Sequence, residues 1–340
     1  MGTRPQARAV CTNTNDHEQD ALLLEKRPVK ERDSQAVLDS RMVLNRTSIF
    51  RATLLIVISA CCFGSLTTVT LLAMQTGFSL VNVIFWRFSI AAVLLGLITW
   101  RTRNEHRFNK AAARLMIMGG LAQALISYLS FKALDYLPVG ALAFLFYTYP
   151  AWVAIISSVR GQEMLTRPRL IALAIAMVGI AVMVGAPHVI ALSTIGILMA
   201  LGTALLYALY LPMIHEAQKE LPALLASSYL VTGIAITFFV VSLMTGGINF
   251  PGTATLWGYL FLLSVVGTVF AFGALMAGLH ILGPVRTSII STVEPFFTAI
   301  LGAIVLRQGL TLAIIAGGAL IAIAVIILEQ SSVREEPVSA

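Results

Sequence analysis

The sequence YPAWVAIISSVRGQEMLT at residues 149–166 has a counterpart, EPFFTAILGAIVLRQGLT, at residues 294–311. A shift of 145 residues places Pro150 on Pro295 and aligns the Leu-Thr pair that closes each stretch. Raw identity is modest for a chain so rich in Ala, Ile and Leu, and the spacing is the stronger signal. A proline inside an apolar run, followed at a fixed distance by Leu-Thr, indicates an internal repeat. Each proline is predicted to kink a helix, because it removes one backbone donor.

The composition around this repeat is that of a membrane protein. Of the 340 residues, 58% are hydrophobic and 11% are charged, whereas a soluble domain usually carries about 25% charged residues. So few polar side chains cannot cover the apolar surface of a water-soluble protein, whereas in a membrane the lipid covers it. A helix needs roughly 20 apolar residues to cross the hydrocarbon core, and about ten segments qualify. The ten segments lie near residues 52–73, 80–100, 112–132, 138–158, 169–186, 193–213, 223–245, 255–279, 287–306 and 310–328.

The repeat divides these ten segments into five followed by five. Because five is odd, two tandem halves must cross the membrane in opposite directions. The predicted fold is therefore an all-α integral membrane protein with about ten transmembrane helices, arranged as two inverted five-helix repeats. Secondary transporters of this plan place their site near the midplane, between the halves, so we expect a solute site near Pro150 and Pro295. The expected organisation is a disordered cytoplasmic tail at 1–48, repeats at 49–187 and 188–330, and a cytoplasmic tail at 331–340.

The net charge of +7 gives no reason to expect nucleic acid, because the basic residues lie in loops between apolar segments. Almost all of them fall on one side of the membrane if both termini lie there, and the opposite side receives only Lys132 and Arg307. Under the positive-inside rule, this bias predicts a multi-pass protein of the cell membrane with both termini in the cytoplasm. The basic side carries Arg46, Arg51, Arg101, Arg103, Arg107, Lys110, Arg114, Arg160, Arg167, Arg169, Lys219, Arg286 and Arg334.

Several short motifs, in order and spacing, resemble those of the drug/metabolite transporter superfamily, and within it the EamA-type ten-helix permeases. The motifs are FGSLTTVTLLAMQ at 63–75, WRF at 86–88, FKALDYLPVGALAFLFYTYPAWVAII at 131–156 and GLHILGPVRTSIISTVEPFFTAILGAIVLRQGLT at 278–311. The resemblance covers about residues 50–330. It implies two EamA-like repeats that move small metabolites, amino acids or drugs, often outward.

The chain departs from that family at one position. Relatives often carry a glutamate shortly before the Leu-Thr pair in each half. Here the first half has Glu163, whereas the second half has Gln308. The resemblance therefore does not imply an essential acid at this place in the second half.

Two charged residues fall inside predicted spans, where a charge costs roughly 2.5–3.5 kcal/mol. Glu294 directly precedes Pro295, and in the functional interpretation it lines the transport path and takes up a proton or a substrate amine. In the structural interpretation it caps backbone groups freed at the kink. Its repeat counterpart is Tyr149, so the halves would present an acid and a phenol at equivalent places. Arg87, in the second span, is expected either to bind an anionic substrate group or to bond backbone carbonyls.

Weaker candidates for the lining of a site are polar or aromatic. Tyr147 flanks the fourth-span proline, Tyr207 and Tyr210 lie three residues apart in the sixth span, and Gln123 lies in the third. Such residues suit amphipathic metabolites. They also hold helices together or anchor them at the membrane interface, so both interpretations stay open.

Two further acids are expected to be structural. Lys132 and Asp135 are three residues apart, share a helix face and are predicted to pair. Glu163 stands among arginines in a predicted cytoplasmic loop. We expect it to be an ion-pair partner or a cap for the fifth helix.

The leading functional interpretation is a secondary transporter, and specifically an exporter, of small organic metabolites, amino acids or drugs. The alternative is a membrane-embedded enzyme or a sensor that transports nothing. An enzyme would need a coherent polar cluster, and neither the histidines nor the three cysteines show a metal or catalytic spacing. We therefore expect no catalytic residue, cofactor or metal. The expected partners are a small-molecule substrate and the lipid bilayer, with protons as the candidate coupling ion and a second copy of the chain, in a homodimer, as a candidate partner.

Overall fold

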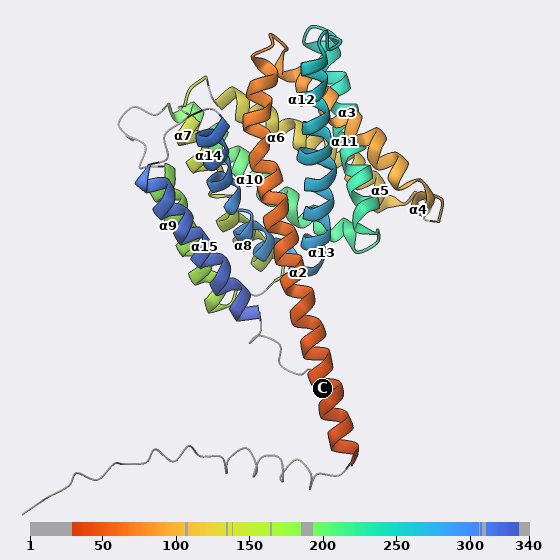
Figure 1. The fold of residues 1–340 in the computed structure, drawn as a ribbon, viewed down its shortest axis with the longest axis vertical. Coiled ribbons are helices and arrows are strands. Elements are labelled where there is room, and N and C mark those ends of the chain that lie inside the picture. The colour runs from red at the N-terminus through yellow and green to blue at the C-terminus, as the bar shows by residue number, and fades with distance from the viewer. Residues whose placement is uncertain are drawn as a thin grey trace, which may run out of the picture. The chain divides into compact units, whose positions relative to one another are not determined.

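The computed structural model describes eight stretches of the chain, and throughout them the regular secondary structure is helical. The chain divides into two compact units, residues 1–47 and 48–340. The helices discussed below belong to the second unit, except for the start of the first described helix (Figure 1). The described residues are 29–105, 108–133, 135–137, 139–163, 165–184, 193–305, 307 and 311–332.

The first described helix, α2 (Val29–Met74), is longer than the predicted first span. Between Pro28 and Gly64 the sequence holds no proline and no glycine, so it contains no signal that would end a helix. Residues 29–48 of the expected disordered tail are therefore helical, whereas residues 1–28 lie outside the described residues. The portion from Thr47 to Met74 is long and apolar enough to span a membrane.

Nine helical runs in the described part of the chain are long and apolar enough to cross a membrane. Nine of the ten predicted segments correspond one to one with these runs, although most differ from them by a few residues at their ends. The predicted segment at 287–306 is divided between the end of α13 and α14 (Val293–Val305), which are separated by a turn. The remaining elements are α3 (Leu80–Ile98), α4 (Trp100–Glu105), α5 (Lys110–Arg114), η1 (Leu115–Gly119), α6 (Gly120–Ala133), α7 (Val139–Phe146), α8 (Tyr149–Val159), α9 (Arg167–Val184), α10 (Thr194–Gln218), α11 (Ala223–Met244), α12 (Ala254–Ser264), η3 (Val265–Phe270), α13 (Ala271–Ile290) and α15 (Leu312–Ser332).

Helices that are equivalent in the two halves pack against each other. The last spans, α9 and α15, lie side by side (Figure 1). A side chain on Gly179 or Gly317 would meet the carbonyl oxygen of the other glycine, so the absence of side chains lets the two backbones approach. The second spans, α3 and α11, form the other such pair. Pairing of equivalent helices is the packing expected of two repeats related by a two-fold axis.

The first span of each half packs against the opposite half. On α2, Ile56 fits against Gly278 of α13, and the hydroxyl of Ser59 donates to the Ala271 carbonyl at 2.8 Å. In the second half, α10 packs against α6, α7 and α8 of the first. The interface between the halves is therefore built from these two first spans together with the pairs α9–α15 and α3–α11.

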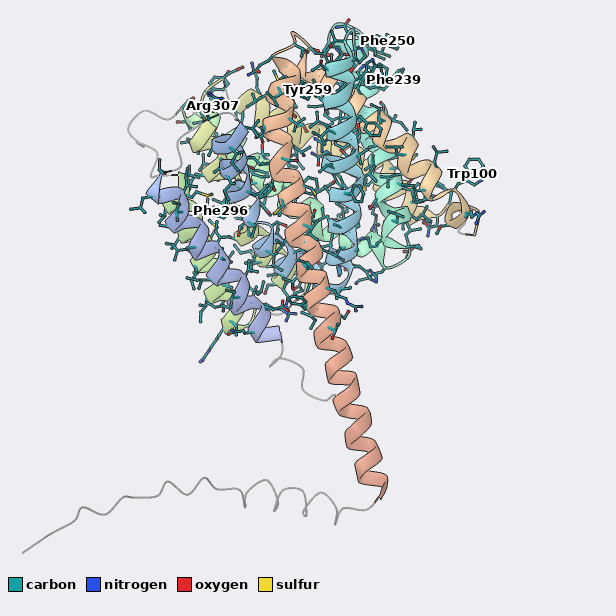
Figure 2. All side chains as sticks on the ribbon, in the orientation of Figure 1. Trp100, Phe239, Phe250, Tyr259, Phe296 and Arg307 are labelled. Carbon is teal, nitrogen blue, oxygen red and sulfur yellow. The ribbon has the colours of Figure 1, made fainter. Side chains whose placement is uncertain are left out.

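Large apolar side chains remain on the outside of the helices. Leu97, Leu198 and Ile304 keep 67%, 65% and 70% of their surface exposed, which is expected where lipid rather than water surrounds the protein. Trp100 and Phe250 project from the periphery, beyond the ends of spans (Figure 2). Aromatic side chains at such positions commonly anchor helices at the membrane interface.

Candidate functional site

The fourth and ninth predicted spans are both interrupted, and each interruption lies directly before the proline of the repeat. In the first half, a turn at residues 147–148 separates α7 from α8, and Pro150 lies in the first turn of α8. In the second half, a turn at residues 291–292 precedes α14, and Pro295 lies in its first turn. The prolines were expected to kink continuous helices. They instead begin new helices, where their missing N–H costs nothing because it would have no intrahelical acceptor.

Each interruption contains an equivalent hydrogen bond from a threonine hydroxyl. The hydroxyl of Thr148 donates to the Leu145 carbonyl at 2.6 Å, and the hydroxyl of Thr292 donates to the Ile289 carbonyl at 2.7 Å. In each case the carbonyl three residues earlier accepts from both the hydroxyl and the backbone amide of the threonine, whereas in a continuing helix it would pair with the amide of the following residue. The repeat therefore extends from sequence spacing to local backbone chemistry.

A direct contact joins the two interruptions. The phenol of Tyr149 donates to the Ser288 carbonyl at 3.4 Å. In an unbroken helix that carbonyl would accept from the amide of Thr292, but this amide bonds Ile289 instead. Tyr149, which is 2% exposed, thus satisfies a carbonyl that the break in the other half leaves free.

An aromatic cluster surrounds this contact. Tyr149 and Tyr207 meet edge to face with ring centroids 4.7 Å apart, and Tyr210 and Tyr147 lie within 6.2 Å of one or the other. The structure thus brings together all four tyrosines that the sequence suggested. It adds Phe146, which contacts Tyr147, Tyr149 and Tyr207. Phe146 sits in an apolar run, and its sequence context carries no signal that would separate it from core residues.

Glu294, on the first turn of α14, lies beside this tyrosine cluster. Its carboxylate interacts electrostatically with Tyr147, Tyr149 and Tyr207. It remains partly accessible, and within the described part of the chain its carboxylate has no hydrogen-bond or ion-pair partner. A carboxylate inside a membrane protein that lacks a protein partner is a candidate for binding a proton or a cation.

Arg87 lies apart from Glu294. Its Nε donates to the Thr268 hydroxyl at 2.8 Å and its Nη2 to the Gly267 carbonyl at 3.0 Å. The α2 helix intervenes, because Gly64 contacts Glu294 whereas Leu66 contacts Gly267. At 3.6 residues per turn, positions two apart are rotated by about 200° around the helix, so the backbone of Glu294 and the η3 segment that Arg87 binds lie on opposite faces of α2.

The guanidinium of Arg87 also lies over the ring of Phe88, 4.6 Å from its centroid. Its third nitrogen, Nη1, makes no hydrogen bond within the described residues. Gln123, the remaining sequence candidate, is half-buried on α6 and likewise makes no hydrogen bond within the described residues. Neither residue is drawn into the tyrosine cluster by a hydrogen bond.

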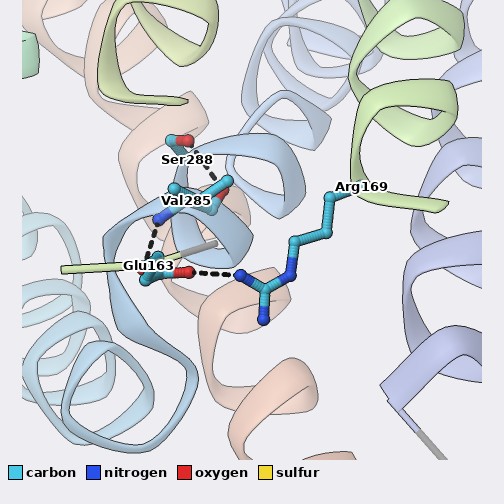
Figure 3. Close-up of polar contacts among 4 residues, drawn as sticks. All are labelled: Glu163, Arg169, Val285 and Ser288. Carbon is cyan, nitrogen blue, oxygen red and sulfur yellow. Dashed lines mark hydrogen bonds and ion pairs between the residues drawn. The ribbon is translucent and has the colours of Figure 1, made fainter. Parts of the chain in front are cut away.

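Glu163 has a role that spans both halves (Figure 3). Its Oε2 pairs with Arg169 at 2.9 Å, and its Oε1 accepts from the Val285 amide at 3.0 Å. The expected ion pair with the start of the fifth helix is confirmed, but the helix that Glu163 caps belongs to the second half. Gln308, its repeat counterpart, lies outside the described residues. The predicted pair of Lys132 with Asp135 is confirmed at 2.7 Å.

Comparison with known proteins identifies the family to which the chain belongs. A solved structure titled "Crystal structure of protein" is similar over 84% of this chain and 99% of that chain, with 18% identity and a TM-score of 0.67. At this identity the similarity concerns the fold alone. No curated protein matched the sequence. The sequence model of the EamA-like transporter family matches twice, at residues 50–185 and 194–329, which confirms the predicted pair of five-helix repeats. The chain therefore belongs to the EamA-like transporter family, within the drug/metabolite transporter superfamily.

Proposed function

We propose that this transporter moves a small organic solute by alternating access, with its site at the meeting point of the two interrupted spans. The observation that carries the proposal is the carboxylate of Glu294, which has no partner among the described residues and lies beside three tyrosines, Tyr147 and Tyr149 of the first half and Tyr207 of α10. Irregular backbone within the membrane is typical of transport sites, because it is tolerated only where protein or a wet cavity satisfies it.

The chemistry of the cluster favours a substrate that carries an amine. An ionised Glu294 with no cation beside it is costly in a low-dielectric environment. It is therefore expected to hold either a proton or a positively charged group of the substrate. The faces of Tyr147, Tyr149 and Tyr207 would add cation–π attraction, worth about 0.5–2 kcal/mol, and an apolar surface for the rest of the solute. Displacement of the proton by the amine would couple the two movements.

The buried phenol of Tyr210 supplies a further polar contact. Its hydroxyl oxygen has no hydrogen-bond partner among the described residues. A buried hydroxyl without a partner is unfavourable, and a polar group on a bound solute would satisfy it. In this proposal Tyr210 orients the solute, and neither Gln123 nor Arg87, which lies beyond α2, belongs to the site.

The orientation follows from the charge bias of the loops. We place both termini in the cytoplasm and the protein in the cell membrane, with export as the direction that the family resemblance favours. Labelling of single cysteines in the loop at 101–110 by an impermeant thiol reagent tests this placement. Labelling from outside intact cells would overturn it.

Reconstitution tests the mechanism. Purified protein in proteoliposomes is offered a panel of amines, amino acids and neutral metabolites, with and without a proton gradient. We expect the gradient to drive accumulation of an amine in the parent. Glu294→Gln should abolish gradient-driven accumulation and retain exchange of the solute. Glu329→Gln is the matched control, because Glu329 also lies in a span but already accepts a hydrogen bond from Thr53 at 2.6 Å. A Glu294→Gln protein that accumulates solute as the parent does would overturn the proposal.

A further inference from the structure

A carboxylate of the first half caps a helix of the second half where that helix is broken. Within α13, Gly283 has φ 76° and ψ 171°, which interrupts the helix. Pro284 follows and has no amide hydrogen, so Val285 is the first residue after the break that needs an acceptor. The Glu163 carboxylate provides it at 3.0 Å. An anion at the start of a helix is also favoured by the helix dipole.

The glycine at the break makes room for this carboxylate. A Cβ on Gly283 would lie 2.5 Å from Oε1 of Glu163. The positive φ independently disfavours any other residue. Glu163 and Arg169, which pair at 2.9 Å, keep only 12% and 14% of their side-chain surface exposed. The capping contact is therefore an enclosed, closely fitted arrangement.

The first half holds the segment at 284–290 near both of its ends. Glu163 binds the amide of Val285, and Tyr149 binds the carbonyl of Ser288. The segment then passes through the turn at 291–292 into the helix that carries Glu294. Any displacement of the segment relative to the first half must break one of these two contacts, and it would be transmitted to the site.

Buried polar groups near the contact between Glu163 and the segment at 284–290 disfavour the closed arrangement. Ser157 and Thr287 are 0% exposed, and their hydroxyl oxygens have no partner among the described residues. Gln162 and Thr166 are only partly buried, but Oε1 of Gln162 and the hydroxyl oxygen of Thr166 are buried and likewise have no partner among the described residues. Each would regain hydrogen bonds if water entered. An interface held by a few specific contacts but lined with such groups is suited to opening and closing.

We propose that Glu163 is a positioning residue that latches the segment at 284–290 and so closes the site toward the side of the basic loops. The loop at 160–166 lies on that side, which the charge bias places in the cytoplasm. The latch rests on the proposed function, because a gate presupposes transport. Its test uses no substrate, so failure of the latch leaves the role of Glu294 standing.

The test is side-specific labelling. Cys11, Cys61 and Cys62 are first replaced, and Thr287→Cys is introduced as a reporter in full-length protein in oriented vesicles. With Glu163→Ala, we expect an impermeant maleimide on the basic-loop side to label the reporter roughly tenfold faster or more, as for loss of one charge-assisted contact. Glu163→Gln retains an acceptor for Val285 and should show a smaller increase. Thr99→Cys is the matched control, because Thr99 is also a buried threonine, at 2% exposure, and lies at the same face of the membrane, directly before the basic loop at 101–110.

The outcomes separate a latch from general support of the fold. Faster labelling at position 287 with no change at 99 supports the latch. Equal acceleration at both positions would show that Glu163→Ala loosens the whole protein, and it would overturn the proposal. An unchanged rate at position 287 would overturn it as well. If Glu163→Ala protein cannot be purified, the Glu163→Gln pair of measurements decides in the same way.

Discussion

The phenol of Tyr149 donates a hydrogen bond to the backbone carbonyl of Ser288, at 3.4 Å and across 139 residues of sequence. The acceptor is free because the helix breaks just beyond it, and the donor sits at the corresponding break of the other half. The interruption of the first half thus supplies the donor that the interruption of the second half lacks. This contact explains how the second-half span can be broken in the interior without leaving the carbonyl of Ser288 unpaired.

Tyr149→Phe removes only the hydroxyl and leaves the ring in the aromatic cluster. The carbonyl of Ser288 then loses its donor in a buried place, and we expect a loss of about 1–3 kcal/mol in the free energy of unfolding. Thermal unfolding in detergent measures the effect. Tyr136→Phe is the control, because Tyr136 is 39% exposed. Equal melting temperatures for the two variants would show that the contact contributes nothing to stability.

The sequence predicts the fold through features that are local or additive. Apolar runs reveal spans because each run meets lipid along its own length. The spacing around Pro150 and Pro295 reveals the repeat because both halves contain the same local structure, a turn followed by a helix with proline in its first turn. It does not reveal whether a proline kinks a helix or begins a new one. At Pro295 that choice depends on a distant donor, Tyr149, which satisfies the carbonyl of Ser288 that the break exposes.

The candidate site was predictable in composition but not in arrangement. A tyrosine and an acid at equivalent repeat positions drew attention to Tyr149 and Glu294. Tyr207 joins them only because α10 packs against helices of the first half. The periodicity of the sequence does not predict this packing. The cap of Val285 by Glu163 depends on a contact between residues 122 apart. The Gly-Pro pair before Val285 is a local signal for a break, but it does not predict that Glu163 accepts the hydrogen bond from the Val285 amide.

Gly64 permits the close approach of α2 to the helix that carries Glu294. A Cβ there would lie 2.9 Å from the Glu294 carbonyl oxygen and 3.1 Å from the Thr298 hydroxyl. Because one of these atoms is backbone, Gly64→Ala must displace a helix. We expect it to cost about 1–3 kcal/mol of stability and to impair transport. Gly96→Ala is the matched control: nothing lies within 4 Å of its Cβ position, so alanine should be neutral or stabilise by about 0.5–1 kcal/mol. Similar behaviour of the two variants would contradict this account.

Arg87 can be assigned by comparing two variants. Lysine at this position cannot reach both the Thr268 hydroxyl and the Gly267 carbonyl with one point charge. We expect Arg87→Lys to lower the free energy of unfolding by about 1–3 kcal/mol, and Thr268→Val to lower it by part of that amount. If Arg87 only braces η3, the KM for solutes should stay unchanged in both proteins. A rise in KM that is confined to carboxylate-bearing solutes and to Arg87→Lys would instead place Arg87 at the substrate.

Glu163 should give the protein a pH dependence of known sign. Burial raises the pKa of the Glu163 carboxyl above its ordinary value of 4.5, and the Val285 amide, Arg169 and Arg286 offset this only in part. Because the folded pKa lies above the unfolded one, the stability contributed by Glu163 is fully present below about pH 4.5. It is lost as the pH rises through the raised folded pKa.

Glu163→Gln removes this titration while keeping the shape of the side chain. The difference in Tm between the parent and Glu163→Gln should therefore shift against the parent as the pH rises from about 4.5 through the raised folded pKa of Glu163, and then become constant. Thermal unfolding of both proteins in the same detergent between about pH 4.5 and 7.5 measures that difference, and all other titrating groups cancel in it. A difference that moves in favour of the parent over this range would mean that Arg169 and the Val285 amide outweigh burial, and that the folded pKa lies below the ordinary value.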